Sequence, residues 1–276
     1  MSKSNNFQKA FTLLELLLVI TSIGVLAALL LPALAKAKDK ARSTQCLGNL
    51  RQLTLCSHLY AGDNDDLLPP NDSVVTPDGT PNGQTIAEGV SWCPDHPQTD
   101  INTVNIERGV LFGYNRSVAI YHCPADTATL QTTNGQPLPQ LRQRSYNMSQ
   151  SVNGFPDYDE VLAANIPSFP KFTAIRDPAA SKLIVFLEVH EDEILDTLFG
   201  IPTQIEESWY RQYWFDVPAN RHDQGENLSF ADGHVEHWRW KTPKAITVPR
   251  GTMQPVTPEE MDDYLRLQSG FRQTFN

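Results

Sequence analysis

The chain has 276 residues, of which 40% are hydrophobic and 20% charged, and its formal net charge is −10. Residues 1–61 hold seven Lys or Arg and two acidic residues, so residues 62–276 carry a net charge of −15. An acidic segment of this size argues against nucleic-acid binding, because phosphate backbones are bound by clustered Lys and Arg. The composition indicates a membrane anchor followed by one soluble head.

The apolar run lies at residues 11–31, and Glu15 is its only charged residue. A helix of that length spans about 30 Å, the thickness of a bilayer core. A cleaved secretory signal has a shorter apolar run of about 7–15 residues. Ala33-Leu34-Ala35 resembles the cleavage site of such a signal, so a cleaved signal is the alternative to a retained membrane helix.

The segment Lys9-Ala10-Phe11-Thr12-Leu13-Leu14-Glu15, followed by the apolar run, resembles the prepilin signal of type IV pilins and type II secretion pseudopilins. The resemblance implies that a prepilin peptidase cuts between Ala10 and Phe11, that Phe11 is then N-methylated, and that Glu15 acts in assembly. Ala10 stands where the family usually has Gly. A membrane acid usually faces a partner, and the α-amino group of a neighbouring Phe11 is a matching cation. The alternative is a hydrated or neutral Glu15 near the interface.

The flanking charges oppose the topology that this resemblance implies. Four basic residues, at 36, 38, 40 and 42, follow the apolar run, and only Lys3 and Lys9 precede it. The positive-inside rule alone would leave the head in the cytoplasm or leave the orientation undecided. The processing motif instead implies a single-pass inner-membrane protein with an extracytoplasmic head.

The fold expected is α+β, with a long N-terminal helix packed on a small antiparallel sheet that has long loops. Cys46, Leu50, Leu53 and Ser57 form a stripe at helical spacing, with Leu47 beside it. The predicted helix runs from about residue 12 to residue 61. The expected parts are a leader (1–10), a transmembrane helix (11–31), a stem (32–61) and a head (62–276).

Four strands are predicted in the head, at 117–121, 183–187, 227–231 and 234–240. The last two flank Asp232-Gly233, which is typical of a type I′ hairpin. In that register Phe230 faces Val235 and Leu228 faces His237.

A second resemblance rests on His222, Asp232 and Gly233, spaced as His-x9-Asp-Gly, with the hairpin at 222–240. It is to a bacterial family of prepilin-type proteins with a processing-associated C-terminal domain. Further pieces are Cys46-Leu-Gly-Asn-Leu-Arg-Gln-Leu, Tyr60-Ala-Gly-Asp-Asn-Asp, Cys123-Pro-Ala-Asp and Ser145-Tyr-Asn-Met. The match concerns architecture more than function.

A catalytic reading of His222, Asp232 and His234 is disfavoured. The strand between His222 and Asp232 separates them by roughly 13 Å. Asp232-Gly233 is then needed for turn geometry, and we expect His222 to hold its loop by hydrogen bonding. His234 and Glu236 share one face of a strand and lack a third ligand.

The four cysteines and an acidic turn are the other candidate sites. Cys46 and Cys56 lie about 15 Å apart on one helix, too far for a disulfide. A Cys93–Cys123 bond is the simplest pairing, and Cys46–Cys123 is the alternative. Zinc at Cys93, His96, His122 and Cys123 is disfavoured, because residues 122 and 123 point to opposite faces if extended.

Asp63, Asp65 and Asp66 are a weak calcium candidate that lacks the spaced ligands of a calcium hand. No other metal or cofactor is predicted.

The predicted function is a non-catalytic pilin-like or pseudopilin-like subunit of a filament or secretion pseudopilus. Its expected partners are the prepilin peptidase and methyltransferase, other pilin-like subunits, the inner-membrane assembly machinery and membrane lipid. One alternative is a membrane-anchored extracytoplasmic binding protein that does not polymerise. Another is an anchored hydrolase built on His222, Asp232 and His234.

Overall fold

A computed structural model describes residues 12–71, 74–75, 85–86, 90–132, 134–155, 164–203, 212–249 and 251–275. The chain forms two compact units, Met1–Ala41 and Arg42–Asn276. The second unit therefore contains the last part of the predicted stem as well as the head.

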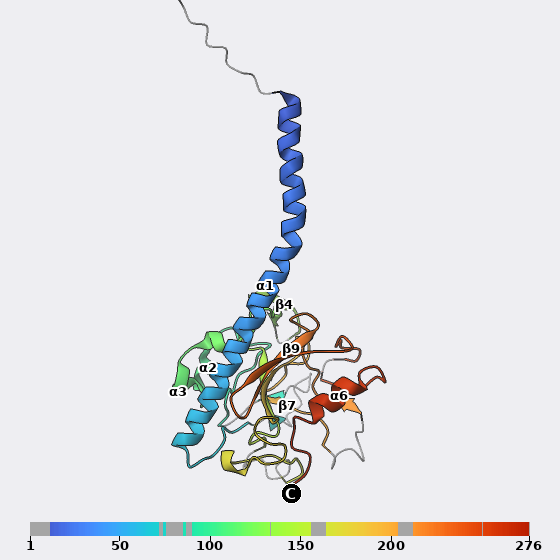
Figure 1. The fold of residues 1–276 in the computed structure, drawn as a ribbon. Helices are drawn as coiled ribbons and strands as arrows, with labels where there is room; N and C mark the ends of the chain where they lie inside the picture. The colour runs from blue at the N-terminus through green and yellow to red at the C-terminus, as the bar shows by residue number, and fades with distance from the viewer. Residues whose placement is uncertain are drawn as a thin grey trace, which may run out of the picture. The chain divides into compact units, whose positions relative to one another are not determined.

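The first helix, α1, runs over Leu13–Asp63 and includes Pro32 (Figure 1). Its bounds are close to the predicted 12–61. Cys46, Leu50, Leu53 and Ser57 are all buried, which confirms the predicted stripe. Buried side chains at three- and four-residue spacing place one face of this part of α1 against the head.

Truncating that face should destabilise the head. Leu53→Ala removes a fully buried side chain that packs in a core shared with Trp92 and Phe186. We expect the free energy of unfolding to fall by about 3 kcal/mol, measured by denaturant titration of the full chain in detergent. Leu55 on the same helix is 56% exposed, so Leu55→Ala should change it by less than about 0.5 kcal/mol. Equal effects of the two variants would contradict this packing.

The other helices in the described residues are short. They are α2 (Val104–Arg108), α3 (Phe112–Asn115) and α6 (Met261–Gln268), with 3-10 turns η1 (Val118–Tyr121) and η2 (Phe172–Ala174). The strands are β1 (Val74–Val75), β2 (Thr85–Ile86), β3 (Thr129–Gln131), β4 (Pro137–Leu141), β5 (Tyr146–Ser149), β6 (Ile184–Glu188), β7 (Leu198–Phe199), β8 (Tyr213–Trp214), β9 (Gly225–Phe230), β10 (Val235–Arg239) and β11 (Gln254–Pro255).

The main sheet has five strands in the order β10-β9-β6-β5-β7. The neighbours from β10 to β5 are antiparallel, and β7 pairs with β5 in parallel. The α+β class is therefore as predicted, although the sheet is mixed rather than purely antiparallel. Three separate two-stranded sheets pair β1 with β2, β3 with β4, and β8 with β11.

Both faces of the sheet are covered. Every residue of the central strands β6 and β9 is buried. One core joins the buried face of α1 to residues such as Phe186, and a second joins Leu228 and Trp238 to Tyr264 and Leu267 of α6. Figure 1 shows β9 between the second half of α1 and α6. Side chains of β6 and β9 therefore pack in one core or the other according to their face.

The predicted strand at 117–121 is wrong. Residues Val118–Tyr121 form the 3-10 turn η1, and Asn49 of α1 donates side-chain hydrogen bonds to the carbonyls of Ala119 (3.5 Å) and His122 (3.0 Å). A short apolar run does not distinguish a strand from a helical turn. Here a long-range side chain, rather than a neighbouring strand, satisfies the backbone carbonyls.

The hairpin is present, but its register differs by one residue. Val235 faces Ser229 instead of the predicted Phe230, and Leu228 faces Glu236 instead of the predicted His237. The loop has three residues, because Phe230 N donates to His234 O at 3.0 Å and Gly233 N donates to Phe230 O at 2.9 Å. Gly233 has φ of 92°, the left-handed glycine of a three-residue hairpin loop rather than a two-residue type I′ turn.

Candidate functional site

The first functional feature is the apolar surface of α1 in the N-terminal unit. Its large apolar side chains are exposed, from Leu13 (84%) through Leu29 (72%) to Leu34 (66%). By length and composition, α1 is long and apolar enough to cross a membrane. A helix that is apolar on all sides is stable only when lipid or other helices surround it. This helix can therefore act as a membrane anchor.

Glu15 lies in the first turn of this helix and closes a capping box with Thr12. Its Oε2 accepts hydrogen bonds from the backbone N–H and the hydroxyl of Thr12, both at 2.8 Å. The Thr12 hydroxyl oxygen in turn accepts the N–H of Glu15 at 3.2 Å. This reciprocal pattern stabilises a helix start, a role that the spacing Thr-x-x-Glu could have indicated. The predicted processing residues Ala10 and Phe11 lie outside the described residues.

The second feature is a buried cluster of two thiols, a carboxylate and an imidazole: Cys46, Cys123, Glu188 and His222. One ligand atom from each lies within 4.8 Å of every other. Within the described ranges, no other group of three or more His, Cys, Asp or Glu side chains converges in this way. The cluster lies entirely within the unit Arg42–Asn276.

Each residue of the cluster comes from a different element. Cys46 lies on α1, Cys123 follows η1, Glu188 is the last residue of β6, and His222 precedes β9. The His222 Nε2 atom lies 3.2 Å from Cys123 Sγ and 3.3 Å from Glu188 Oε2. The cluster thus joins the stem helix, the central strand and two loops.

The loop that carries His222 has an unusual backbone. His222, Asp223 and Gln224 have φ of 52°, 65° and 61°, the left-handed region that costs about 1 kcal/mol or more for non-glycine residues. Arg221 and Gly225 close the loop with two backbone hydrogen bonds of 2.6 and 2.7 Å. A Cβ atom on Gly225 would lie 2.1 Å from the carbonyl oxygen of Trp238, so glycine is required there. The fold holds this strained loop so that His222 points into the cluster.

Further groups surround the cluster and donate hydrogen bonds to it. Tyr146 Oη donates to Cys46 Sγ at 3.2 Å, and the N–H of Ala125 donates to Cys123 Sγ at 3.4 Å. Glu188 Oε2 accepts the N–H of Asn227 at 2.9 Å, and Arg221 Nη1 lies 3.5 Å from Glu188 Oε1. Both sulfurs and the carboxylate are therefore oriented by their neighbours.

The surroundings shift the pKa values of the cluster. Burial raises the pKa of the Cys123 thiol. Burial acts to raise the pKa of Glu188, but the hydrogen bond and charge of His222 and the charge of Arg221 outweigh it and hold it at about 2. Burial acts to lower the pKa of His222, but contacts with Cys123 and Glu188 raise it to about 10. Burial raises the pKa of the Cys46 thiol as well, so these shifts favour an ion pair of His222 and Glu188 beside two neutral thiols.

The predicted Cys93–Cys123 disulfide is not formed, since all four cysteines are free and buried. Cys93 Sγ donates instead to Asp95 Oδ1 at 3.3 Å, while Cys123 belongs to the cluster. The disfavoured zinc set at 93, 96, 122 and 123 does not converge either. The sulfur of Cys46, the partner of Cys123 in the alternative pairing, lies within 4.8 Å of the Cys123 sulfur.

The two ends of the His-x9-Asp-Gly motif lie in different parts of the structure. His222 does hydrogen-bond, to Cys123 and Glu188, while Asp232 Oδ1 accepts the N–H of His234 at 3.1 Å in the hairpin loop. His234 and Asp232 side chains are 37% and 39% exposed. The structure does not bring His222, Asp232 and His234 together as a catalytic set would require.

The acidic turn after α1 does not gather a ligand set. Asp63 ends the helix, and Asp65 and Asp66 have φ of 52° and 68°. The Asp66 carboxylate accepts hydrogen bonds from the backbone and the hydroxyl of Thr173. Among the described residues, these three carboxylates do not converge, so the geometry gives the calcium candidate no support.

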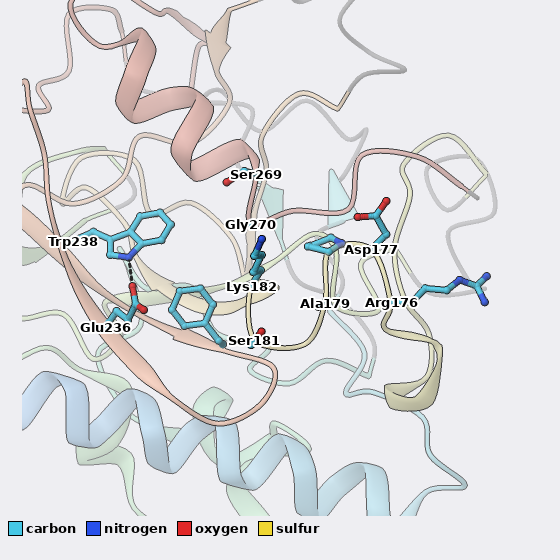
Figure 2. Close-up of a pocket in the computed structure, with 11 residues that line it drawn as sticks. Arg176, Asp177, Ala179, Ser181, Lys182, Glu236, Trp238, Ser269 and Gly270 are labelled. Atoms are coloured by element: carbon cyan, nitrogen blue, oxygen red, sulfur yellow. Dashed lines mark hydrogen bonds between the residues drawn. The ribbon is translucent and has the colours of Figure 1, made fainter.

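A hollow of about 570 Å³ lies away from the cluster, beside the β9–β10 hairpin. Figure 2 shows Trp238 and Glu236 on one side, joined by a hydrogen bond of 2.5 Å from Trp238 Nε1 to Glu236 Oε2. Arg176 and Asp177 lie on the other side, and Lys182 lies between the two sides (Figure 2). The residues lining this hollow include no Cys or His, so it offers neither a thiol nor an imidazole for chemistry.

Two curated proteins are similar to parts of the chain. The Type II secretion system core protein G of Pseudomonas aeruginosa is 33% identical over 57 residues, which are 21% of this chain and 40% of that protein. Fimbrial protein Q of Moraxella bovis is 49% identical over 45 residues, which are 16% of this chain and 29% of that protein. Part of the chain is therefore pilin-like. The match covers less than half the length of each relative.

No family profile and no solved structure matches the chain. The similarity to a secretion protein and a fimbrial protein agrees with the long apolar helix at the N-terminus. The resemblance of the C-terminal hairpin to the His-x9-Asp-Gly family stays a prediction.

Proposed function

We propose that the chain is a non-enzymatic, pilin-like structural subunit whose apolar helix is first held in the inner membrane and then packs in a filament or secretion pseudopilus. One observation carries this proposal: the apolar side chains of α1 from Leu13 to Leu34 are exposed, and Glu15 is the one charged residue between Leu13 and Ala35. Helices of this kind can exchange lipid contacts for contacts with other apolar helices.

The proposed processing defines the role of Glu15. A cut between Ala10 and Phe11 by a prepilin peptidase leaves a methylated amine on Phe11. That amine, on a neighbouring subunit, pairs with the Glu15 carboxylate in an apolar environment where an unpaired charge is costly. An ionised carboxylate has about four acceptor sites, so Glu15 can keep its bonds to Thr12 and still bind the amine. Capping and pairing are then successive uses of one side chain.

The relatives support the class of function. One is a type II secretion system core protein and the other a fimbrial protein. Other pilin-like subunits, the prepilin peptidase and the inner-membrane assembly machinery are accordingly the proposed partners. The head, whose residues 62–276 carry the negative charge of the chain, forms the outer surface of the assembly.

The N-terminal mass of the chain isolated from its native membranes tests the processing step. We expect a chain that begins at N-methylated Phe11. A chain beginning at Met1 or Ser2, or beyond Ala35, would replace the subunit proposal with an anchored or secreted binding protein that does not polymerise.

The Glu15→Gln variant tests the assembly step separately. Glutamine preserves the capping box and removes the charge, so α1 forms while the pair with the amine is lost. We expect sheared, pelletable filaments to fall by more than about tenfold, which corresponds to about 1.4 kcal/mol.

Thr12→Val is the matched control for that variant, because it removes the capping hydroxyl and keeps the charge of Glu15. It should cost only about 1 kcal/mol of helix stability and leave filaments at near wild-type yield. A normal filament yield from Glu15→Gln would contradict the assembly role and leave Glu15 only its role in capping the helix.

A further inference from the structure

We propose that Cys46, Cys123, Glu188 and His222 form a zinc site that fastens the stem helix to the head. This inference goes beyond the subunit proposal and does not depend on it. It rests on the convergence of four ligand atoms from four separate elements.

The geometry fits a tetrahedral ion. With Zn–S of about 2.3 Å and Zn–N or Zn–O of about 2.0 Å, the edges of a tetrahedral site are about 3.3–3.8 Å long. His222 Nε2 lies 3.2 Å from Cys123 Sγ and 3.3 Å from Glu188 Oε2, and all four atoms lie within 4.8 Å of one another. The upper limit of 4.8 Å exceeds a tetrahedral edge by about 1.0–1.5 Å, so side-chain shifts of up to about 1 Å would bring the set to bonding distance around one ion.

The chemistry of the four donors selects the metal. Thiolate with imidazole and carboxylate is a set that zinc accepts, whereas calcium and magnesium take oxygen ligands only. Cys46, Cys123 and Glu188 are fully buried and His222 is 9% exposed. Four protein ligands in a buried position leave no open coordination site for a substrate, so the site is structural rather than catalytic.

The outer contacts are those that a zinc site needs. Each sulfur accepts a hydrogen bond from outside the cluster. Cys46 Sγ accepts from Tyr146 Oη, and Cys123 Sγ accepts from the N–H of Ala125. The Glu188 carboxylate is held by the N–H of Asn227 and by Arg221. Such donors orient metal ligands and stabilise their charged forms.

The charges balance around a divalent cation. Two thiolates and one carboxylate carry three negative charges, a zinc ion neutralises two, and the Arg221 guanidinium beside Glu188 neutralises the third. Arg221 also reaches Asp126 and Glu191, but Asp126 has a second cation in Arg142, and the Glu191 side chain is exposed to water. A buried site with no net charge avoids the desolvation cost of an uncompensated ion.

A Cys46–Cys123 disulfide is the competing use of the same sulfurs. It would leave the buried His222 and Glu188 side chains facing an S–S bond that offers them no charge and only weak hydrogen bonding. With a disulfide, the strained left-handed backbone at His222 would hold the imidazole against Glu188 alone and not against a metal ion. The position of both residues therefore favours a metal over a disulfide.

Metal analysis of the full chain tests the proposal. The wild-type chain, purified in mild detergent without chelators, should contain about one zinc ion per molecule. Replacement by Co²⁺ should give thiolate-to-cobalt charge-transfer absorption in the near ultraviolet. Stripping the metal with a strong chelator should lower Tm by about 10 °C, and added Zn²⁺ should restore it.

Matched cysteine variants locate the site. Cys46→Ser and Cys123→Ser should each lose most of the bound zinc and the charge-transfer band. Cys56→Ser should keep both, since Cys56 is a buried cysteine on the same helix as Cys46, and its sulfur contacts Asn115 rather than the cluster.

Three outcomes would overturn the proposal. One is a wild-type chain that is free of zinc and shows no thiolate band with Co²⁺, a measurement that needs no variant to fold. Another is a Cys46–Cys123 disulfide in a peptide map of the non-reduced chain. The third is equal zinc content in the Cys46→Ser and Cys56→Ser chains.

Discussion

Replacing Arg144 with methionine is expected to destabilise the head by about 3–5 kcal/mol, the cost of leaving a buried charge unpaired. Arg144 is fully buried, and its Nε donates to Asp95 Oδ1 at 2.6 Å. Its terminal nitrogens donate to the carbonyl oxygens of Tyr146 and Asp196, both at 2.6 Å. Methionine fills similar space but donates to none of these groups. Because burial already raises the pKa of Asp95 and Arg144 opposes that rise, loss of the cation would favour the neutral acid.

The measurement is the midpoint of denaturant unfolding for the full chain in detergent. Arg144→Lys keeps the charge but not the planar set of donors, so its midpoint should fall between those of wild type and Arg144→Met. Arg239→Met is the control, because Arg239 is 65% exposed and lies 3.9 Å from an exposed Asp223, and such pairs contribute about 0–1 kcal/mol. An Arg144→Met chain as stable as the control would show that these buried bonds have no net effect on stability.

The elements governed by local pattern were predictable from the sequence. The stripe from Cys46 to Ser57 follows the helical period, so the buried face of α1 could be assigned before the structure was known. The hairpin could be located from Asp232-Gly233, but its register could not. A left-handed glycine serves both two- and three-residue loops, and the choice between them shifts every cross-strand pair by one.

The buried cluster was not predictable in the same way, because its residues have no local spacing. Cys46, Cys123, Glu188 and His222 come from a helix, a loop, a strand end and a strained turn. The predicted strand ended at residue 187, one short of Glu188, although β6 continues to that residue. Long-range pairing of β6 with both β5 and β9 determines the position of Glu188, and composition does not report such pairing.

One signal of the cluster was available in the sequence: the Cys-Pro piece and the His belong to the same family resemblance. Cys123-Pro-Ala-Asp and His222 both belong to the resemblance to the His-x9-Asp-Gly family, but the sequence alone does not show that they meet. The structure puts their side chains 3.2 Å apart. Asp126, at the end of the Cys-Pro-Ala-Asp piece, likewise contacts Arg221, the residue before His222. Two motifs far apart in the sequence are therefore two halves of one buried polar network.

That network leads to the second large effect: Asp126→Asn should destabilise the head by about 3–5 kcal/mol. Asp126 Oδ2 accepts from Arg142 Nε at 2.7 Å and from Ser145 Oγ at 2.6 Å, and Arg221 Nη2 lies 3.4 Å away. Asparagine has the same shape but no charge, so two buried guanidinium groups lose their shared anion. Asp262→Asn is the control, because Asp262 pairs with Lys241 on the exposed surface and its loss should cost less than about 1 kcal/mol.

The pH dependence of the difference between wild type and Asp126→Asn gives a second measurement. Burial acts to raise the pKa of Asp126, but the charges of Arg221 and Arg142 outweigh burial and lower it from 3.8 to about 2. Because the folded-state pKa is the lower one, the stabilisation is fully present above about pH 4 and is lost as the pH falls towards 2. The two unfolding curves should therefore be well separated at pH 7 and converge in acid. A separation that stays constant down to pH 2 would mean that the charge of Asp126 does not hold Arg142 and Arg221 in place.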